Sequence, residues 1–129
     1  MASATPKLKY IILYVEDLDR AVGFYQKAFQ LEEKMRQGPY AEMNTGAVTL
    51  GLVTRDFVGE HTGIKLPAGG GASEIAFVVS EAAVPKQFEA ALAAGGTSVL
   101  KPRKQPWGQL VSYVRDPDGH LVEICSPTD

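Results

Sequence analysis

The sequence has few of the residue types that mark several large protein classes. Its 129 residues include one cysteine, Cys125, which excludes an internal disulfide and a cysteine-based zinc site and fits a reducing cytoplasm. Thirteen basic and fifteen acidic residues leave a formal charge of −2 without a basic cluster, so no nucleic-acid partner is expected. No apolar run approaches the roughly 18 residues of a membrane span. We therefore expect a cytoplasmic protein without a membrane partner.

What the chain does contain is enough apolar sequence for one core, because 45% of its residues are hydrophobic. A chain of this length predicts a single domain. We expect a loose N-terminal tail over residues 1–7 and one domain over residues 8–129.

The same order of elements is predicted twice. Apolar alternation and helical periodicity in the first half predict a strand, a helix and three strands, at residues 8–15, 17–31, 32–37, 40–45 and 48–53. The second half repeats this order at residues 73–79, 84–94, 98–103, 109–115 and 120–125. Residues 55–72 are polar and glycine-bearing and show neither period, which predicts a linker. The chain is thus predicted to hold two β-α-β-β-β modules, 8–54 and 73–127.

Two carboxylates interrupt strands that are otherwise apolar. In the final strand the period of two places Glu123 with Leu121 and Cys125, opposite Val122 and Ile124, and Glu74 begins the first strand of the second half. A solvated strand face and a cavity wall both explain this pattern. Two carboxylates facing a cavity require a cation, a basic partner, or one carboxyl that stays protonated.

Three stretches carry a resemblance to a known family: IILYVEDLDRAVGFYQKAFQL, SEIAFVV and YVRDPDGHLVEI. With these, the chain resembles the glyoxalase I, bleomycin-resistance and extradiol-dioxygenase superfamily, also called vicinal oxygen chelate proteins. The resemblance implies an α+β fold in which two paired β-α-β-β-β modules form an open curved mixed sheet around a cavity. It also implies a small-molecule ligand and a homodimer that can complete the cavity across its interface.

The resemblance also implies four positions for metal ligands, which fall on Tyr10, Gly51, Glu74 and Glu123. The family usually has His or Gln, Glu, His and Glu there, so only Glu123 matches. With Glu74 and Glu123 as ligands, the ion would be Mg²⁺, Mn²⁺, Ni²⁺ or Zn²⁺, and Mg²⁺ or Mn²⁺ suits the oxygen donors better than Zn²⁺. The implied activity is a lactoylglutathione lyase type of reaction, in which Glu123 or Glu74 is the catalytic base that removes a proton next to a carbonyl.

Two other functions fit the same fold. A metal-free pocket for an aromatic or cationic compound would use the rings of Tyr10, Tyr14, Trp107 and Tyr113 to bind the ligand. A protein interaction module would instead have its cavity filled by side chains. The remaining candidates favour neither: His61 falls in the linker, His120 has the strand parity opposite to Glu123, and Cys125 is read as a small buried residue.

Overall fold

The computed structural model describes residues 5–128. Residues 1–4 of the predicted tail and residue 129 of the predicted domain lie outside the described residues. Its eight strands form two four-stranded sheets. The first module contains β1 (Tyr10–Val15), α1 (Leu18–Phe29), β2 (Glu32–Gln37), β3 (Tyr40–Asn44) and β4 (Thr49–Thr54). The second contains β5 (Glu74–Val78), α3 (Val84–Ala93), β6 (Thr97–Lys104), β7 (Leu110–Arg115) and β8 (Leu121–Cys125).

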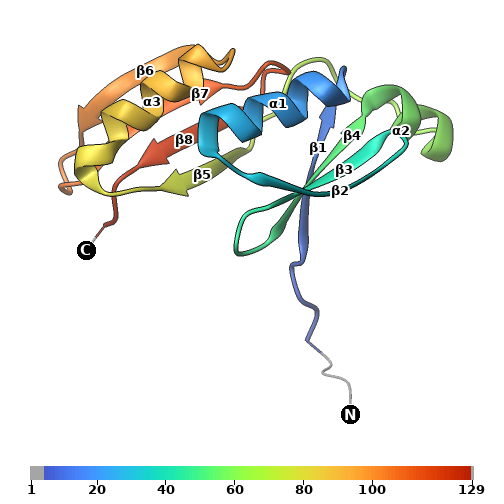
Figure 1. The fold of residues 1–129 in the computed structure, drawn as a ribbon, viewed down its shortest axis with the longest axis horizontal. Coiled ribbons are helices and arrows are strands. Elements are labelled where there is room, and N and C mark those ends of the chain that lie inside the picture. The colour runs from blue at the N-terminus through green and yellow to red at the C-terminus, as the bar shows by residue number, and fades with distance from the viewer. Residues whose placement is uncertain (1–4, 129) are drawn as a thin grey trace.

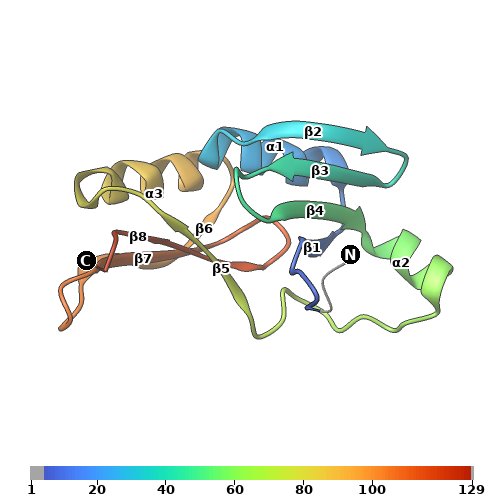
Figure 2. The same ribbon diagram turned by 90° about the horizontal axis from the view of Figure 1, so that it is seen from below.

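The two sheets have the same topology, which confirms the predicted duplication. Their strand orders are β1-β4-β3-β2 and β5-β8-β7-β6. In each sheet the first strand pairs in parallel with the last, and the other pairings are antiparallel. The modules lie at opposite ends of the long axis (Figures 1 and 2), and β1 and β5 are edge strands of separate sheets.

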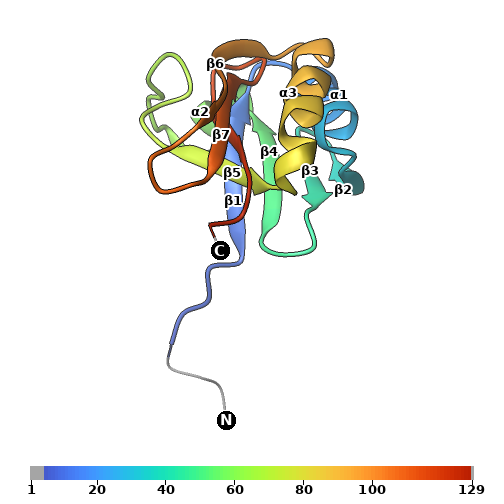
Figure 3. The ribbon, with the colours of Figure 1, turned by 90° about the vertical axis from the view of Figure 1, so that its left-hand side faces the viewer.

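Helices α1 and α3 form one layer, and a core shared by both modules lies beneath it. Figure 3 shows α1 and α3 beside one another. One buried cluster contains residues of both modules, including Tyr25, Met43, Phe88 and Ile124. The modules are also joined by a stack of Phe29 on Phe77, whose ring centroids lie 4.0 Å apart. This shared core holds the two open sheet faces in a defined relative position.

Capping residues explain where the helices begin and end. The side chain of Asp17 accepts a hydrogen bond from the backbone N–H of Arg20 at 3.1 Å, as the sequence predicts for an N-cap. Pro85 lies in the first turn of α3, where a missing N–H costs little. A 3-10 turn, Glu81–Ala83, precedes α3.

The segment predicted as a linker without regular structure begins with a helix, α2 (Arg55–Thr62), so that part of the prediction is wrong. The helix buries only Val58, so its sequence lacks the apolar stripe from which a helix is predicted. The helix is marked by its caps instead: Thr54 accepts from the N–H of Phe57 at 3.3 Å, and Gly63 ends the helix with a φ of 73°.

Candidate functional site

The pair of carboxyl groups predicted from strand parity is present on the open face of the second sheet. Ala76 is the parallel partner of Glu123, so Glu74 and Glu123 lie diagonally on neighbouring strands. A hydrogen bond in which protonated Glu74 donates to Glu123, together with partial burial and the charge of Glu123, raises the pKa of Glu74 to about 7. Of the three ways to offset two adjacent carboxylates, the raised pKa of Glu74 fits one carboxyl that stays protonated.

Two further groups flank this pair. Tyr113 is the cross-strand partner of Glu123, and burial together with the charges of Glu123 and Glu74 raises the pKa of its phenol. Burial and Glu123 also raise the pKa of the Cys125 thiol, which is only 3% exposed. The thiol is thus protonated at neutral pH, as suits a small buried residue better than a nucleophile.

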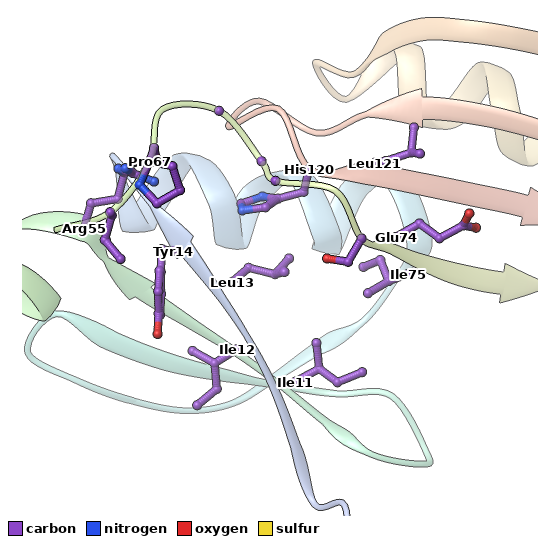
Figure 4. A pocket seen from close by; sticks show the side chains of 15 residues that line it. Ile11, Ile12, Leu13, Tyr14, Arg55, Pro67, Glu74, Ile75, His120 and Leu121 are labelled. Carbon is purple, nitrogen blue, oxygen red and sulfur yellow. Dashed lines mark hydrogen bonds between the residues drawn. The ribbon is translucent and has the colours of Figure 1, made fainter. Parts of the chain in front are cut away.

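A cavity of about 380 Å³ lies between the modules, beside the carboxyl pair. We call it the main cavity. Its apolar wall comes from β1 and β5, and its roof is the loop before β5; it is lined by Ile11, Ile12, Leu13, Tyr14, Arg55, Leu66, Pro67, Gly69, Gly70, Gly71, Ser73, Glu74, Ile75, His120 and Leu121. Figure 4 shows Glu74 at its rim, with the side chain turned toward β8, and His120 pointing inward.

The main cavity continues along the groove between the two sheets. A second cavity of about 430 Å³ shares Ile11, Glu74 and Ile75 with it and extends along β5 to Val78. Neither space is filled by side chains, which is the reverse of what a plain interaction module predicts. Cavities of this size suit small organic ligands.

The four predicted substrate-binding aromatics are dispersed over the molecule. Tyr14 lines the main cavity, and Tyr113 adjoins the carboxyl pair. Tyr10 is 42% exposed on the first sheet, and Trp107 is 63% exposed in the β6–β7 turn, where its Nε1 donates to Gln109 at 2.9 Å. Tyr10 and Trp107 line neither cavity, so their contact with a ligand stays a prediction.

The open face of the first sheet holds a polar pair that the sequence analysis missed. The Tyr40 hydroxyl donates to Glu42 at 2.7 Å, and Glu42 is the cross-strand partner of Gly51. A Cβ at Gly51 would lie 3.1 Å from the Tyr40 oxygen, so the tyrosine occupies the space of the absent side chain. The sequence did hold a signal for this pair. Tyr40 and Glu42 alternate with the apolar, buried Ala41 and Met43, which places Tyr40 and Glu42 together on the other face of the strand.

The donor set does not fit the metal site that the family resemblance implies. Among residues 5–128, no group of three His, Cys, Asp or Glu side chains is placed to hold an ion. Glu74 and Glu123 offer carboxylate oxygens, but Gly51 has no side chain and the Tyr40 phenol stands above it. Divalent ions of this kind normally take three or more protein or substrate ligands besides water. The side chains of the described residues therefore do not complete a metal site of this kind.

The two histidines have different surroundings. His61 stacks on Phe57 in α2, with 5.3 Å between ring centroids, and it lines neither cavity. His120 lies on the face opposite Glu123, as strand parity predicts, but it lines the main cavity because β8 begins at the edge of that cavity. Sequence reasoning missed this role. The signal was Asp116, four residues earlier in the same turn, which binds the ring at 2.8 Å.

Comparisons with known proteins agree with this architecture. A family model described as Glyoxalase/Bleomycin resistance protein/Dioxygenase superfamily matches residues 7–124. The crystal structure of a glyoxalase-related enzyme from Fulvimarina pelagi aligns with a TM-score of 0.89 at 27% identity, over 95% of this chain and 89% of that one.

Relatives are also found by sequence. A putative lactoylglutathione lyase of Brassica oleracea var. gemmifera is 30% identical over 121 residues, and the match covers 89% of this chain but 42% of the relative. An uncharacterized protein of Mycobacterium bovis is 32% identical over 121 residues, covering 89% of this chain and 80% of the relative. The chain thus spans less than half the length of the Brassica protein.

Proposed function

We propose that this chain, which belongs to the Glyoxalase/Bleomycin resistance protein/Dioxygenase superfamily, binds a small organic cation with its apolar body in the main cavity. The observation that carries the proposal is the carboxyl pair at the rim. Glu123 raises the pKa of Glu74 to about 7, so the two carboxyl groups disfavour being charged together and a bound cation relieves the repulsion between them. The adjoining cavity wall is mostly aliphatic and accepts the rest of the ligand.

The one cationic side chain lining the main cavity does not neutralise the carboxyl pair. Arg55 donates from Nη2 to the carbonyl of Pro67 at 2.5 Å, and its Nε lies 3.5 Å from Glu16. Its charge is therefore engaged by the loop and by Glu16. This leaves the rim with an acidic character that selects a positively charged group.

Binding of phenyltrimethylammonium tests the proposal, because its charge does not change with pH. We expect calorimetry to detect binding at about pH 8, and Glu74→Gln or Glu123→Gln to weaken it about tenfold, the size of one close charge–charge attraction at a partly exposed site. Glu89→Gln is the matched control, since Glu89 is exposed on α3. Equal affinity for the uncharged isostere tert-butylbenzene would contradict a cation site.

A lyase or isomerase of the lactoylglutathione lyase type is the second candidate, favoured by the pKa of Glu74. A carboxyl group with a pKa of about 7 is suited to removing a proton next to a carbonyl at neutral pH. Glu123 and Tyr113 would then hold and orient the group that carries the proton. The reaction needs stabilisation of the developing negative charge, which two carboxyl groups supply poorly.

Metal content separates the two candidates. The protein is purified without chelators, its metal content is measured, and hemithioacetal isomerisation is assayed with Mg²⁺, Mn²⁺, Ni²⁺ or Zn²⁺. For the cation-binding function we expect no stoichiometric ion and no turnover. A stoichiometric ion that is lost in Glu123→Gln, together with isomerisation, would favour the lyase instead.

A further inference from the structure

The turn between β7 and β8 holds a buried hydrogen-bond network around Asp116, whose exposed fraction is 4%. Its Oδ1 accepts from the backbone N–H groups of Asp118 and His120, both at 2.9 Å. Its Oδ2 accepts from the Tyr25 hydroxyl at 2.7 Å and lies 2.8 Å from His120 Nδ1. Tyr25 belongs to α1, so the network ties the turn of the second module to the helix of the first.

This network sets the proton position on the imidazole of His120. Burial acts to raise the pKa of Asp116, but hydrogen bonds from His120 and Tyr25 outweigh it and lower the pKa. Asp116 is therefore an acceptor at neutral pH, so the proton of a neutral His120 ring resides on Nδ1. The other nitrogen, Nε2, then carries a free lone pair.

The free nitrogen belongs to a ring that lines the main cavity. Figure 4 shows the ring pointing from the start of β8 into the space beside Leu13, beneath the loop that contains Pro67. Within residues 5–128, Nε2 has no hydrogen-bond partner, whereas Nδ1 has Asp116. His120 is only 8% exposed as a whole residue. A ligand therefore reaches its imidazole through the main cavity.

The roof above the ring is held closely. A Cβ on Gly70 would lie 2.3 Å from the carbonyl oxygen of Gly119 and 2.5 Å from the backbone nitrogen of His120. Only glycine permits this approach of the loop to the turn. Arg55 holds the same loop through the Pro67 carbonyl. The imidazole is thus fixed on the Asp116 side by hydrogen bonds and above by the loop.

We propose that His120 contacts the ligand in the main cavity, where its Nε2 accepts a hydrogen bond from a hydroxyl or amide donor on the neutral part of that ligand. Asp116 is a positioning residue that acts through His120, and Tyr25 ties Asp116 to α1. The inference deepens the proposed function and rests on it for the identity of the cavity's ligand: the cationic end of the ligand is bound at Glu74, and a donor group reaches His120.

Phenol and toluene, which differ by one hydroxyl group, test this directly. The ¹⁵N resonances of the imidazole are recorded at about pH 8. We expect His120 to show an unprotonated Nε2, and phenol to shift that resonance while toluene does not. His61 is the internal control, because it lies outside the cavities. An unchanged Nε2 resonance with phenol, or equal shifts with both probes, overturns the proposal.

Variants separate the positioning role from a structural one. In Asp116→Asn the tautomer preference of His120 should be lost and the shift induced by phenol should fall at least threefold. Tyr25→Phe keeps the Asp116–His120 hydrogen bond and covers the case in which Asp116→Asn fails to fold; it should keep the tautomer. A protonated Nε2 in folded Tyr25→Phe would overturn the role of Asp116.

The same spectra distinguish this inference from the proposed function. Glu74→Gln should weaken binding of phenyltrimethylammonium about tenfold, whereas the Nε2 shift that saturating phenol induces in His120 should remain. If phenyltrimethylammonium fails to bind the wild type while phenol still shifts Nε2, the cation site is wrong and the His120 contact holds. If the cation binds and phenol leaves Nε2 unchanged, the reverse is true.

Discussion

Glu74 is the residue through which pH should act on stability. Its pKa in the folded chain is about 7, above the ordinary value of 4.5. The folded chain therefore binds more protons than the unfolded chain between about pH 4.5 and pH 7. This contribution is complete below pH 4.5 and is lost as pH rises through 7. Because Glu74 is exposed at the cavity rim, we expect a loss of at most about 1 kcal/mol.

Chemical denaturation at a series of pH values measures this loss. The free energy of unfolding of the wild type should fall between about pH 5 and pH 8 relative to that of Glu74→Gln, which has no carboxyl to titrate. Glu89→Gln should follow the wild type, because Glu89 is exposed on α3, away from Glu123. Parallel pH curves for wild type and Glu74→Gln would show that Glu74 titrates at an ordinary pKa.

Individual site residues were predictable where a strand alternates cleanly. Glu123 stands among Val122 and Ile124, both fully buried, and its face follows from parity alone. The Asp116–His120 spacing in the turn was a local signal, but the place of His120 in the cavity depends on where β8 begins relative to β1, and Asp116 is also fixed by a hydrogen bond from Tyr25, 91 positions away in the chain. The filling of the space at Gly51 by Tyr40 likewise depends on cross-strand register.

At the level of elements, the interior of α1 contains a position that is open to stabilisation. Gly23 lies within Leu18–Phe29 and has a negative φ, and a Cβ there would have no atom within 4 Å. Alanine loses less conformational entropy than glycine when a helix forms. We expect Gly23→Ala to raise the free energy of unfolding by about 0.5–1 kcal/mol, measured by denaturation. A lower stability would mean that α1 packs more tightly at this position than the structure indicates.

The loop over the main cavity predicts the opposite outcome for Gly70→Ala. The added methyl group would collide with the backbone of Gly119 and His120, so the loop must move away from the turn. We expect a loss of about 1–3 kcal/mol and faster amide hydrogen exchange in residues 66–71 than in the wild type. Gly59→Ala is the matched control, because a Cβ there has no atom within 4 Å. Unchanged exchange in Gly70→Ala would mean that the loop is not held by this contact.

Most element boundaries follow from local sequence, and the exception has a physical reason. The strand at residues 32–37 matches its prediction, and β8 starts one residue later than predicted. Such segments combine strand-forming residues with turn residues at their ends. Helix α2 was missed because periodicity detects a buried stripe, and α2 buries only Val58. Its caps, Thr54 and Gly63, are local signals that carry the information in such cases.

At the scale of the whole molecule, the modules repeat one topology with different side chains on their open faces. Register makes Gly51 equivalent to Glu123 and Glu42 equivalent to Tyr113. Each open face therefore carries a tyrosine beside a glutamate: Tyr40 donates a hydrogen bond to Glu42, and Tyr113 is the cross-strand partner of Glu123. The duplication was visible in the sequence as a repeated order of elements, whereas this exchange of side chains depends on register.

The described part of the chain has no helix long and apolar enough to cross a membrane.

The open faces lead to the last prediction, that two copies of the chain associate. Ile12 is 45% exposed and Val78 61% exposed on strands β1 and β5, beside the cavities. Apolar side chains on the open face of a sheet are stabilised when another surface covers them. A two-fold axis would place the first sheet of each copy over the second sheet of the other. This arrangement would cover the open sheet faces of both copies, together with the Glu74–Glu123 pair of each copy.

Sedimentation velocity at micromolar concentration should therefore give the mass of a dimer for the wild type. Val78→Asp places a charge on the open face of the second sheet and should shift the protein to the monomer with its circular dichroism unchanged, because Val78 contributes little to the core of its own chain. Val99→Asp is the matched control, since Val99 is 49% exposed but lies in the outer edge strand β6. A monomeric wild type, or equal dissociation in both variants, would show that the sheet faces do not form the interface. Because closing the faces also encloses the ligand, Val78→Asp should weaken binding of phenyltrimethylammonium as well, whereas Val99→Asp should not.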